Sequence, residues 1–103
     1  MGLKLQTFIN SQGYKVEEGY FELANVNYNL EINLVTFTGK IYLTKEHKEE
    51  GFRPIDTFDD SFESPTLPED IIKASYDHIK LMAELAKTTG DPKYRGFIDC
   101  EEV

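Results

Sequence analysis

The sequence is poor in the residues that build several common kinds of site. It has one cysteine, Cys100, and no tryptophan among its 103 residues. A single cysteine cannot form an internal disulfide, so the chain is not a disulfide-stabilised secreted scaffold. Its two histidines, His47 and His78, are far apart in the sequence and lack a Cys-x-x-Cys partner, which leaves a structural zinc site without ligands. We therefore expect neither a metal ion nor a cofactor.

Long apolar runs and targeting signals are also missing. No stretch approaches the ~18 consecutive apolar residues of a membrane-spanning helix. The first residues, MGLKLQT, lack the apolar core of a signal peptide, and Gln6 stands where a myristoylation signal needs serine or threonine. We expect a protein that stays in the reducing cytosol or leaves it without a signal peptide.

Positive charge is scarce as well. Eleven lysine and arginine residues accompany 19 aspartate and glutamate residues, which gives a net charge of −8. Nucleic-acid-binding proteins gain most of their affinity from basic side chains, so this charge argues against nucleic acid as a partner. It also disfavours an anionic membrane surface. Nearly all of the excess lies in residues 46–70, where nine carboxylates accompany two basic residues.

Length and composition predict a single domain over residues 1–103. Hydrophobic residues make up 40% and charged residues 29%, which is typical of a globular chain. We expect a β-rich part over 1–62, a long helix over about 67–88 and a short C-terminal tail over 91–103.

Alternation of apolar and polar residues predicts strands in the first half of the chain. The runs cover 3–10, 20–28 and 30–43, with a turn at 11–13. Gly39 is either a hairpin turn or a bulge in one long strand, and the absence of a neighbouring Asn-Gly or Asp-Gly favours the bulge. In the second run, one face would carry Tyr20, Ala24, Val26 and Tyr28, and the other Phe21 and Leu23.

The middle of the chain combines a helical turn with a further strand. Residues 45–50 predict one solvated turn of helix that ends at Gly51. Pro54 cannot donate to a strand ladder, so residues 55–58 are expected to form an edge strand. A loop is expected over 59–65.

The long helix has the clearest local signals. Thr66 and Glu69 form a capping box, and Gly90 is a stop signal. An apolar stripe at spacings of three and four comprises Ile72, Tyr76, Ile79, Ala83 and Ala86. The opposite stripe alternates in sign through Asp70, Lys73, Asp77, Lys80, Glu84 and Lys87. The predicted fold is α+β: an antiparallel β-sheet or small sandwich of about four to six strands packed against one long C-terminal α-helix.

No residue pattern indicates catalysis, so we expect no enzyme and no catalytic residue. The acidic cluster consists of Asp56, Asp59, Asp60 and Glu63. It does not match a calcium loop, and we interpret it as a solvated loop or an edge strand protected by charge. His47 is expected at the surface, His78 to pack its ring at the border of the helix stripes, and Cys100 to be an unreactive thiol.

The aromatic residues leave two alternatives open. One helix covers only one face of a sheet, and aromatic side chains are expected on both faces. Either the sheet curls into a sandwich or barrel that buries them, or they form a protein interface. In the second case, exposed edge strands could bind partners by strand addition.

Several segments in this order resemble a set of small tail-module proteins of long-tailed phages that infect Gram-positive bacteria. The matching segments are YFEL (20–23), LEINLVTF (30–37), KE (45–46) with Gly51, RPI (53–55), FDDSFE (58–63), IKASYDHIK (72–80) and DCEE (99–102). The resemblance implies a non-catalytic structural or accessory role at the distal tail or baseplate, in the virion or in the host cytoplasm during assembly. Partners would be other tail proteins or further copies of the chain.

The expected contact residues are the acidic cluster together with Tyr14, Tyr20, Tyr28 and Tyr42. Two other functions stay open. One is an acidic inhibitor or DNA mimic that acts on a host enzyme, although the charge forms a patch rather than a stripe. The other is a tail assembly factor that is absent from the virion.

Overall fold

A five-stranded antiparallel sheet in the order β6-β5-β4-β1-β7 forms the centre of the structure, a computed structural model that describes residues 2–9 and 13–103. Its strands are β1 (Leu3–Lys4), β4 (Tyr20–Asn29), β5 (Leu34–Tyr42), β6 (Asp56–Glu63) and β7 (Glu101–Glu102). A separate two-stranded sheet pairs β2 (Phe8–Ile9) with β3 (Lys15–Val16). The helices are α1 (Lys45–Glu49), α2 (Ile71–Thr89) and the 3₁₀ helix η1 (Pro92–Phe97).

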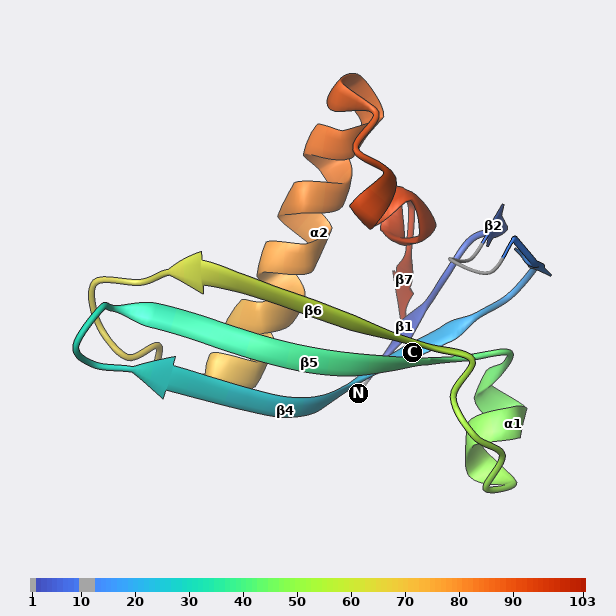
Figure 1. Cartoon of the computed structure of the whole chain (residues 1–103), viewed down its shortest axis with the longest axis horizontal. Helices are drawn as coiled ribbons and strands as arrows, with labels where there is room; N and C mark the ends of the chain where they lie inside the picture. Colours follow the sequence, from blue (N-terminus) through green and yellow to red (C-terminus); the bar gives the residue numbers. More distant parts are fainter. Residues whose placement is uncertain (1, 10–12) are drawn as a thin grey trace.

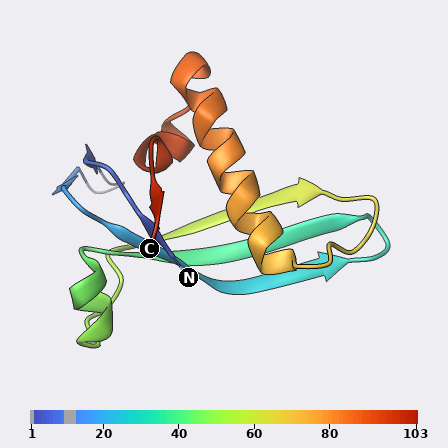
Figure 2. The ribbon, with the colours of Figure 1, turned by 180° about the vertical axis from the view of Figure 1, so that it is seen from behind.

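The long helix α2 covers one face of the sheet only. Figure 1 shows the face of β4, β5 and β6 that faces away from α2, and Figure 2 shows α2 crossing in front of the same strands. The C-terminal part of α2 extends past β6 and lies beside η1. These two layers confirm the predicted α+β fold with one long helix near the C-terminus.

A bulge in β4 changes which side chains face the helix. Leu23 pairs with Gly39 and Asn25 pairs with Thr38, so Ala24 is an extra residue in the ladder. Beyond the bulge, Val26 pairs with buried Phe37 of β5. Val26 therefore lies on the same face of the sheet as Phe21. The predicted faces are confirmed before the bulge and wrong after it: Val26 and Tyr28 share the face of Phe21 and Leu23, because strict alternation does not allow for the inserted residue.

Gly39 belongs to one continuous strand, as expected, but the bulge lies opposite it in β4. A Cβ atom at Gly39 would lie 2.2 Å from ring atoms of Phe21. The glycine therefore gives the Phe21 ring room to lie against the backbone of β5. The ring also makes edge contacts with Phe58, Tyr76 and Phe97, with centroids 5.0–6.2 Å apart.

The β4–β5 connection corrects a second expectation. Residues 30–33 alternate cleanly but form a turn, with Leu30 and Ile32 exposed. Asn33 adopts φ +53°, a left-handed conformation that asparagine tolerates better than most residues. Alternation of apolar and polar residues over only four positions does not distinguish a strand from a turn whose aliphatic side chains face solvent.

The segment expected as a loop over 59–65 is also different. β6 continues to Glu63, which pairs with Leu34, and the ladder runs back to the Asp56–Ile41 pair. Phe58 is buried and Phe62 packs against the core from the same face. Ladder pairing and aromatic burial outweigh the low strand propensity of aspartate.

Helix ends follow capping chemistry. The N-cap of α2 is Asp70, whose carboxylate accepts a hydrogen bond from the backbone N–H of Lys73 at 3.0 Å. Thr66 is therefore not the cap. Gly90 ends α2 with φ +73°, and Gly51 follows α1 with φ +86°, as predicted.

The N-terminal residues form two short strands instead of the predicted single one over 3–10. The backbone N–H of Leu5 donates to the carbonyl of Gly19 at 2.7 Å, and β2 then leaves to pair with β3. Most of the turn expected at 11–13 lies outside the described residues. The chain ends meet at the β1–β7 ladder, where Gly2 and Val103 exchange backbone hydrogen bonds of 3.2 and 3.0 Å.

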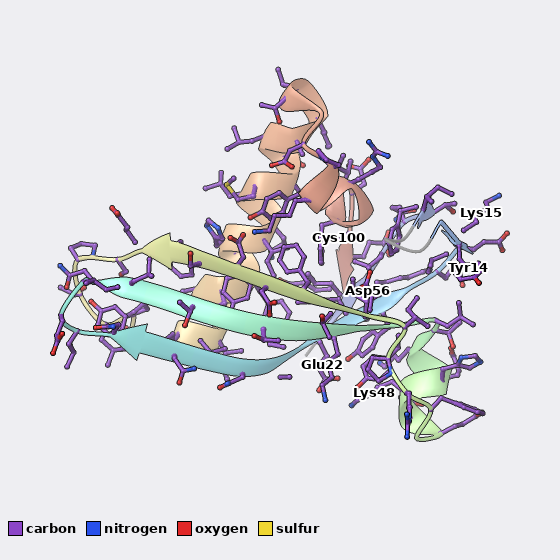
Figure 3. The ribbon with its side chains drawn as sticks, viewed as in Figure 1. Tyr14, Lys15, Glu22, Lys48, Asp56 and Cys100 are labelled. Atoms are coloured by element: carbon purple, nitrogen blue, oxygen red, sulfur yellow. The ribbon has the colours of Figure 1, made fainter. Side chains whose placement is uncertain are left out.

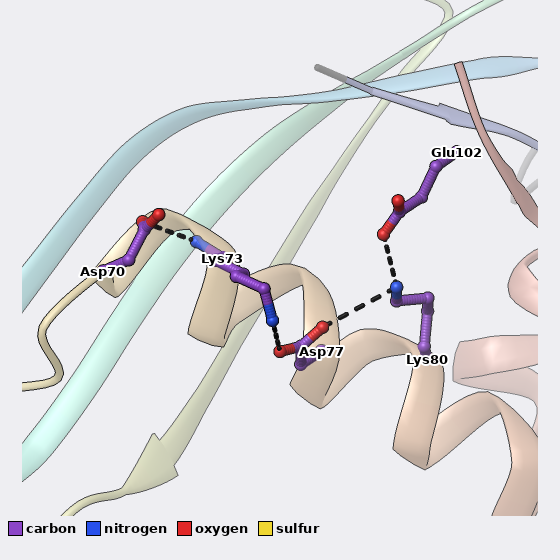
Figure 4. A network of polar contacts seen from close by, with 5 residues as sticks. All are labelled: Asp70, Lys73, Asp77, Lys80 and Glu102. Atoms are coloured by element: carbon purple, nitrogen blue, oxygen red, sulfur yellow. Dashed lines mark hydrogen bonds and ion pairs between the residues drawn. The ribbon is translucent and has the colours of Figure 1, made fainter.

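The charged face of α2 connects it to the far edge of the sheet. Lys73 Nζ lies 3.0 Å from Asp77, and Lys80 contacts both Asp77 and Glu102 of β7 (Figure 4). These pairs confirm the predicted stripe of alternating sign. They hold β7 beside the helix, although each exposed pair contributes at most about 1 kcal/mol.

Candidate functional site

One acidic residue of β6 lies within the core. Alternate residues of β6 pair with the core-facing residues of β5 and therefore face α2. On this face Asp60 lies between Phe58 and Phe62. Its side chain is only 11% exposed. Lys93 Nζ lies 3.1 Å from Asp60 Oδ1, and His78 Nε2 lies 3.4 Å from Asp60 Oδ2. Three elements, β6, α2 and η1, thus meet at one carboxylate.

Aromatic rings enclose this Asp60–His78–Lys93 cluster. The His78 ring stacks on Phe62 at 4.8 Å, and Lys93 Nζ lies 5.5 Å from the centroid of Phe58. The prediction that His78 packs its ring is confirmed. Asp60 Oδ1 accepts a hydrogen bond from Lys93, whereas Oδ2 is buried near His78 without a hydrogen-bond partner. The carboxylate thus links η1 directly to β6 and lies against α2.

The other acidic candidates lie on different sides of β6. Asp56 is half-buried at the start of the strand, whereas Asp59 and Glu63 are exposed on the face away from α2. Alternation along the strand therefore separates the four acids. In the described part of the chain β6 pairs only with β5, so it is an edge of the sheet.

The four tyrosine candidates do not form one surface. Tyr14 is 69% exposed and lies just before β3 (Figure 3). Tyr20 is buried and pairs with half-buried Tyr42 across the ladder. Tyr28 lies near the other end of β4 and donates a hydrogen bond of 2.8 Å to the carbonyl of Ser64. Only Tyr14 therefore presents an exposed ring.

Tyr20 takes part in a polar contact that fixes α1. Its hydroxyl donates to Glu22 Oε2 at 3.0 Å, and Lys48 Nζ of α1 lies 2.9 Å from the same oxygen (Figure 3). Burial and the nearby carboxylate raise the pKa of Tyr20. Burial alone would raise the pKa of Glu22, but hydrogen bonds from Lys48 and Tyr20 outweigh it and lower that pKa.

The face of the sheet opposite α2 is polar along β4, β5 and β6. Two cross-strand rows run across it, one of Asn25, Thr38 and Asp59, the other of Asn27, Thr36 and Ser61. These six residues line part of a shallow hollow. We call them the open face. Hydroxyl and amide groups dominate it, so it offers many hydrogen-bonding groups and little charge.

A cleft lies between the small sheet and η1. Its apolar floor includes Leu5, Phe58 and Phe97, and its rim includes Lys93 and Arg95. The volume is about 420 Å³. Lys93 is already bound to Asp60, so one of the two rim cations has a partner within the chain.

The β4–β5 turn presents apolar side chains to solvent. Leu30 is 77% exposed and Ile32 is 59% exposed, and both line a hollow with half-buried Leu34. We call these three residues the apolar tip. The sequence reading missed the tip because it placed the same residues in a strand, where alternate side chains would be covered.

Cys100 is half-buried, and burial raises the pKa of its thiol.

Within residues 2–9 and 13–103, no group of three or more His, Cys, Asp or Glu side chains is arranged to hold a metal ion. No described helix has the length and apolarity needed to cross a membrane. Comparison of the chain with protein-family models, curated proteins and solved structures finds no match.

Proposed function

We propose that the chain is a non-catalytic structural or accessory protein that acts through protein–protein contacts. The observation that supports this best is the open face together with the edge strand β6 beside it. Because several sequence segments resemble those of small tail-module proteins, we further propose that the chain acts at the distal tail or baseplate of a long-tailed phage.

The physical argument concerns the sheet. A helix layer covers one face of β4, β5 and β6 and leaves the other face to water or to a partner. The open face has the hydroxyl and amide groups of a wet, polar interface, in which bridging waters and direct hydrogen bonds share the contact. The exposed Asp59 and Glu63 on β6 oppose unspecific pairing of the edge with other strands.

The partners under this proposal are other tail proteins or further copies of the chain. A symmetric assembly needs one self-complementary patch or two different patches on each subunit. The open face and the β6 edge are adjacent, so one contact could use both. The protein would then reside in the virion tail, or in the host cytoplasm while tails assemble.

The test is mass spectrometry of particles produced by a phage genome that encodes this chain, with light scattering of the isolated protein. We expect the chain in the particle at a stoichiometry that fits a symmetric ring. Absence from the particle would overturn the structural role and favour an assembly factor or a host-directed inhibitor. A genome without tail genes around this one would overturn the phage assignment.

A matched pair of variants connects this test to the surface. Thr38→Arg introduces a long charged side chain on the central strand of the open face, between Asn25 and Asp59, whereas Glu84→Arg places the same side chain on the exposed face of α2. We expect the first variant to fold and to be lost from particles, and the second to be retained. Retention of both variants would show that the open face is not the contact.

A further inference from the structure

We infer that the apolar tip is a docking element for a different protein, which offers an apolar groove rimmed by lysine or arginine. Leu30 and Ile32 expose most of their side chains at the far end of the β4–β5 hairpin, away from the chain termini (Figure 1). Single exposed aliphatic residues are common at protein surfaces. Several that line one hollow at a projecting end are typical of a contact site.

Hydrogen bonds hold the tip in place. The backbone N–H of Ser64 donates to the carbonyl of Asn33 at 2.8 Å, and Tyr28 donates to the carbonyl of Ser64 at 2.8 Å. Within the turn, the N–H of Glu31 donates to Asn29 Oδ1 at 3.0 Å. The turn is thus tied to the β6–α2 connection. A pre-organised loop loses less conformational entropy when it binds than a free one.

More aliphatic surface lies at the same end of the molecule. Leu67, in the β6–α2 connection, and Ile72, in the first turn of α2, are both exposed. Figures 1 and 2 show this connection next to the β4–β5 turn. Ile72 was expected in the buried stripe of the helix, and its exposure enlarges the apolar surface available to a partner.

The charge around the tip identifies the partner's chemistry. The sequence contains no lysine or arginine over residues 16–39 or 54–72. The acidic residues at this end are Glu31, Glu63, Glu69 and Asp70, and Lys73, which follows Ile72, is already paired with Asp77. A second copy meeting the same tip would bring these carboxylates together, whereas a basic rim would neutralise them. The inference therefore excludes tip-to-tip self-association and specifies a basic, heterologous groove.

This inference rests on the proposed function only in requiring a protein partner. The hollow at the tip shares Asn27 and Thr36 with the open face, but Thr38 lines only the open-face hollow, so a variant at Thr38 separates the two surfaces. Loss of the Thr38→Arg protein from particles with tip binding intact would leave both proposals standing. Retention of Thr38→Arg with tip binding intact would overturn the open-face contact alone.

The experiment uses the full chain with labelled leucine and isoleucine methyl groups, observed by NMR. The probe is a synthetic amphipathic helical peptide of leucine and lysine, compared with one of leucine and glutamate of the same length. The test variant is Leu30→Ser/Ile32→Ser. The control is Leu81→Ser/Leu85→Ser, which removes two exposed aliphatic side chains from α2.

We expect saturable shifts of the Leu30 and Ile32 methyl signals with the lysine peptide, and affinity that falls as salt rises. The tip variant should bind at least about tenfold more weakly, and the α2 control should bind as the unchanged protein does. Several results would overturn the inference: no binding, equal binding of the glutamate peptide, shifts elsewhere, or tip shifts that follow protein concentration alone. Equal loss of binding in the α2 control would also overturn it.

Discussion

The hydroxyl of Tyr76, on α2, accepts a hydrogen bond of 3.1 Å from the backbone N–H of Leu23, on β4. Leu23 is the last paired residue before the bulge at Ala24. A bulge disrupts the ladder and leaves backbone groups to find other partners. Tyr76 is buried, and burial raises the pKa of its phenol, so the hydroxyl is neutral at ordinary pH. The helix therefore completes the hydrogen bonding of an irregular strand.

We expect Tyr76→Phe to destabilise the fold by about 1–3 kcal/mol, because the part-buried N–H of Leu23 would lose its acceptor. Urea unfolding measures the change, and hydrogen exchange of the Leu23 amide should accelerate. Tyr42→Phe is the matched control, since this half-buried tyrosine lies away from α2, and its effect should stay within about 0.5 kcal/mol. Equal effects of the two variants would contradict a special role for the Tyr76 hydroxyl.

Gly39→Ala should destabilise the protein through overpacking. The new methyl group would lie 2.2 Å from the Phe21 ring, so the ring or the strand must move, at a cost of about 1–3 kcal/mol. Phe21→Leu removes the ring and creates space, and the double variant should be less destabilised than the sum of the single ones. Additive effects, measured by chemical unfolding, would show that Gly39 does not make room for Phe21.

Glu22 predicts a pH dependence of stability. Its pKa in the folded protein lies below the ordinary value of 4.5, so its stabilising effect is present above pH 4.5. The effect is lost as the pH falls through the folded-state pKa, where the carboxylate accepts a proton. Unfolding free energies should therefore differ most between wild type and Glu22→Gln near neutral pH, and converge in acid.

Glu50→Gln is the control for that series, because it removes an exposed carboxylate at the end of the same helix that Glu22 contacts. A Glu22→Gln difference that stays constant from neutral pH to pH 3 would contradict the role of the Glu22–Lys48 contact.

The acidic residues of β6 should differ sharply in their effect on stability. Asp60→Ala removes the shared partner of His78 and Lys93, and we expect a loss of about 1–3 kcal/mol. Asp59→Ala changes an exposed side chain and should stay within about 0.5 kcal/mol. Thermal unfolding of the two variants checks the difference. A stable Asp60→Ala protein would mean that aromatic packing alone holds α2 and η1 on the sheet.

The helical part of the fold could be predicted because its signals are local. Spacings of three and four, Gly90 and the alternating charges all lie within the helix itself. The β part depends on pairing between distant residues. The bulge at Ala24 has no signature of its own, and Gly39, the residue that marks it, lies on the partner strand.

The buried cluster illustrates the same difficulty for the site. His78 and Lys93 lie 18 and 33 positions after Asp60, and no local pattern links the three. A signal did exist in the alternation of Phe58, Asp60 and Phe62, which places a carboxylate on an aromatic face and so requires a partner. This alternation was not recognised as a strand because residues 59–65 were predicted to form a loop.

The pairing of Gly2 with Val103 has a mechanical consequence. In this antiparallel geometry the two residues lie opposite each other, so a force applied through them would open the β1–β7 ladder one bond at a time, like a zipper. The core between α2 and the three long strands would not bear that load at first. Under tension, the chain should therefore release β7 at low force, while β1 stays paired with β4 and keeps Leu3 in the core.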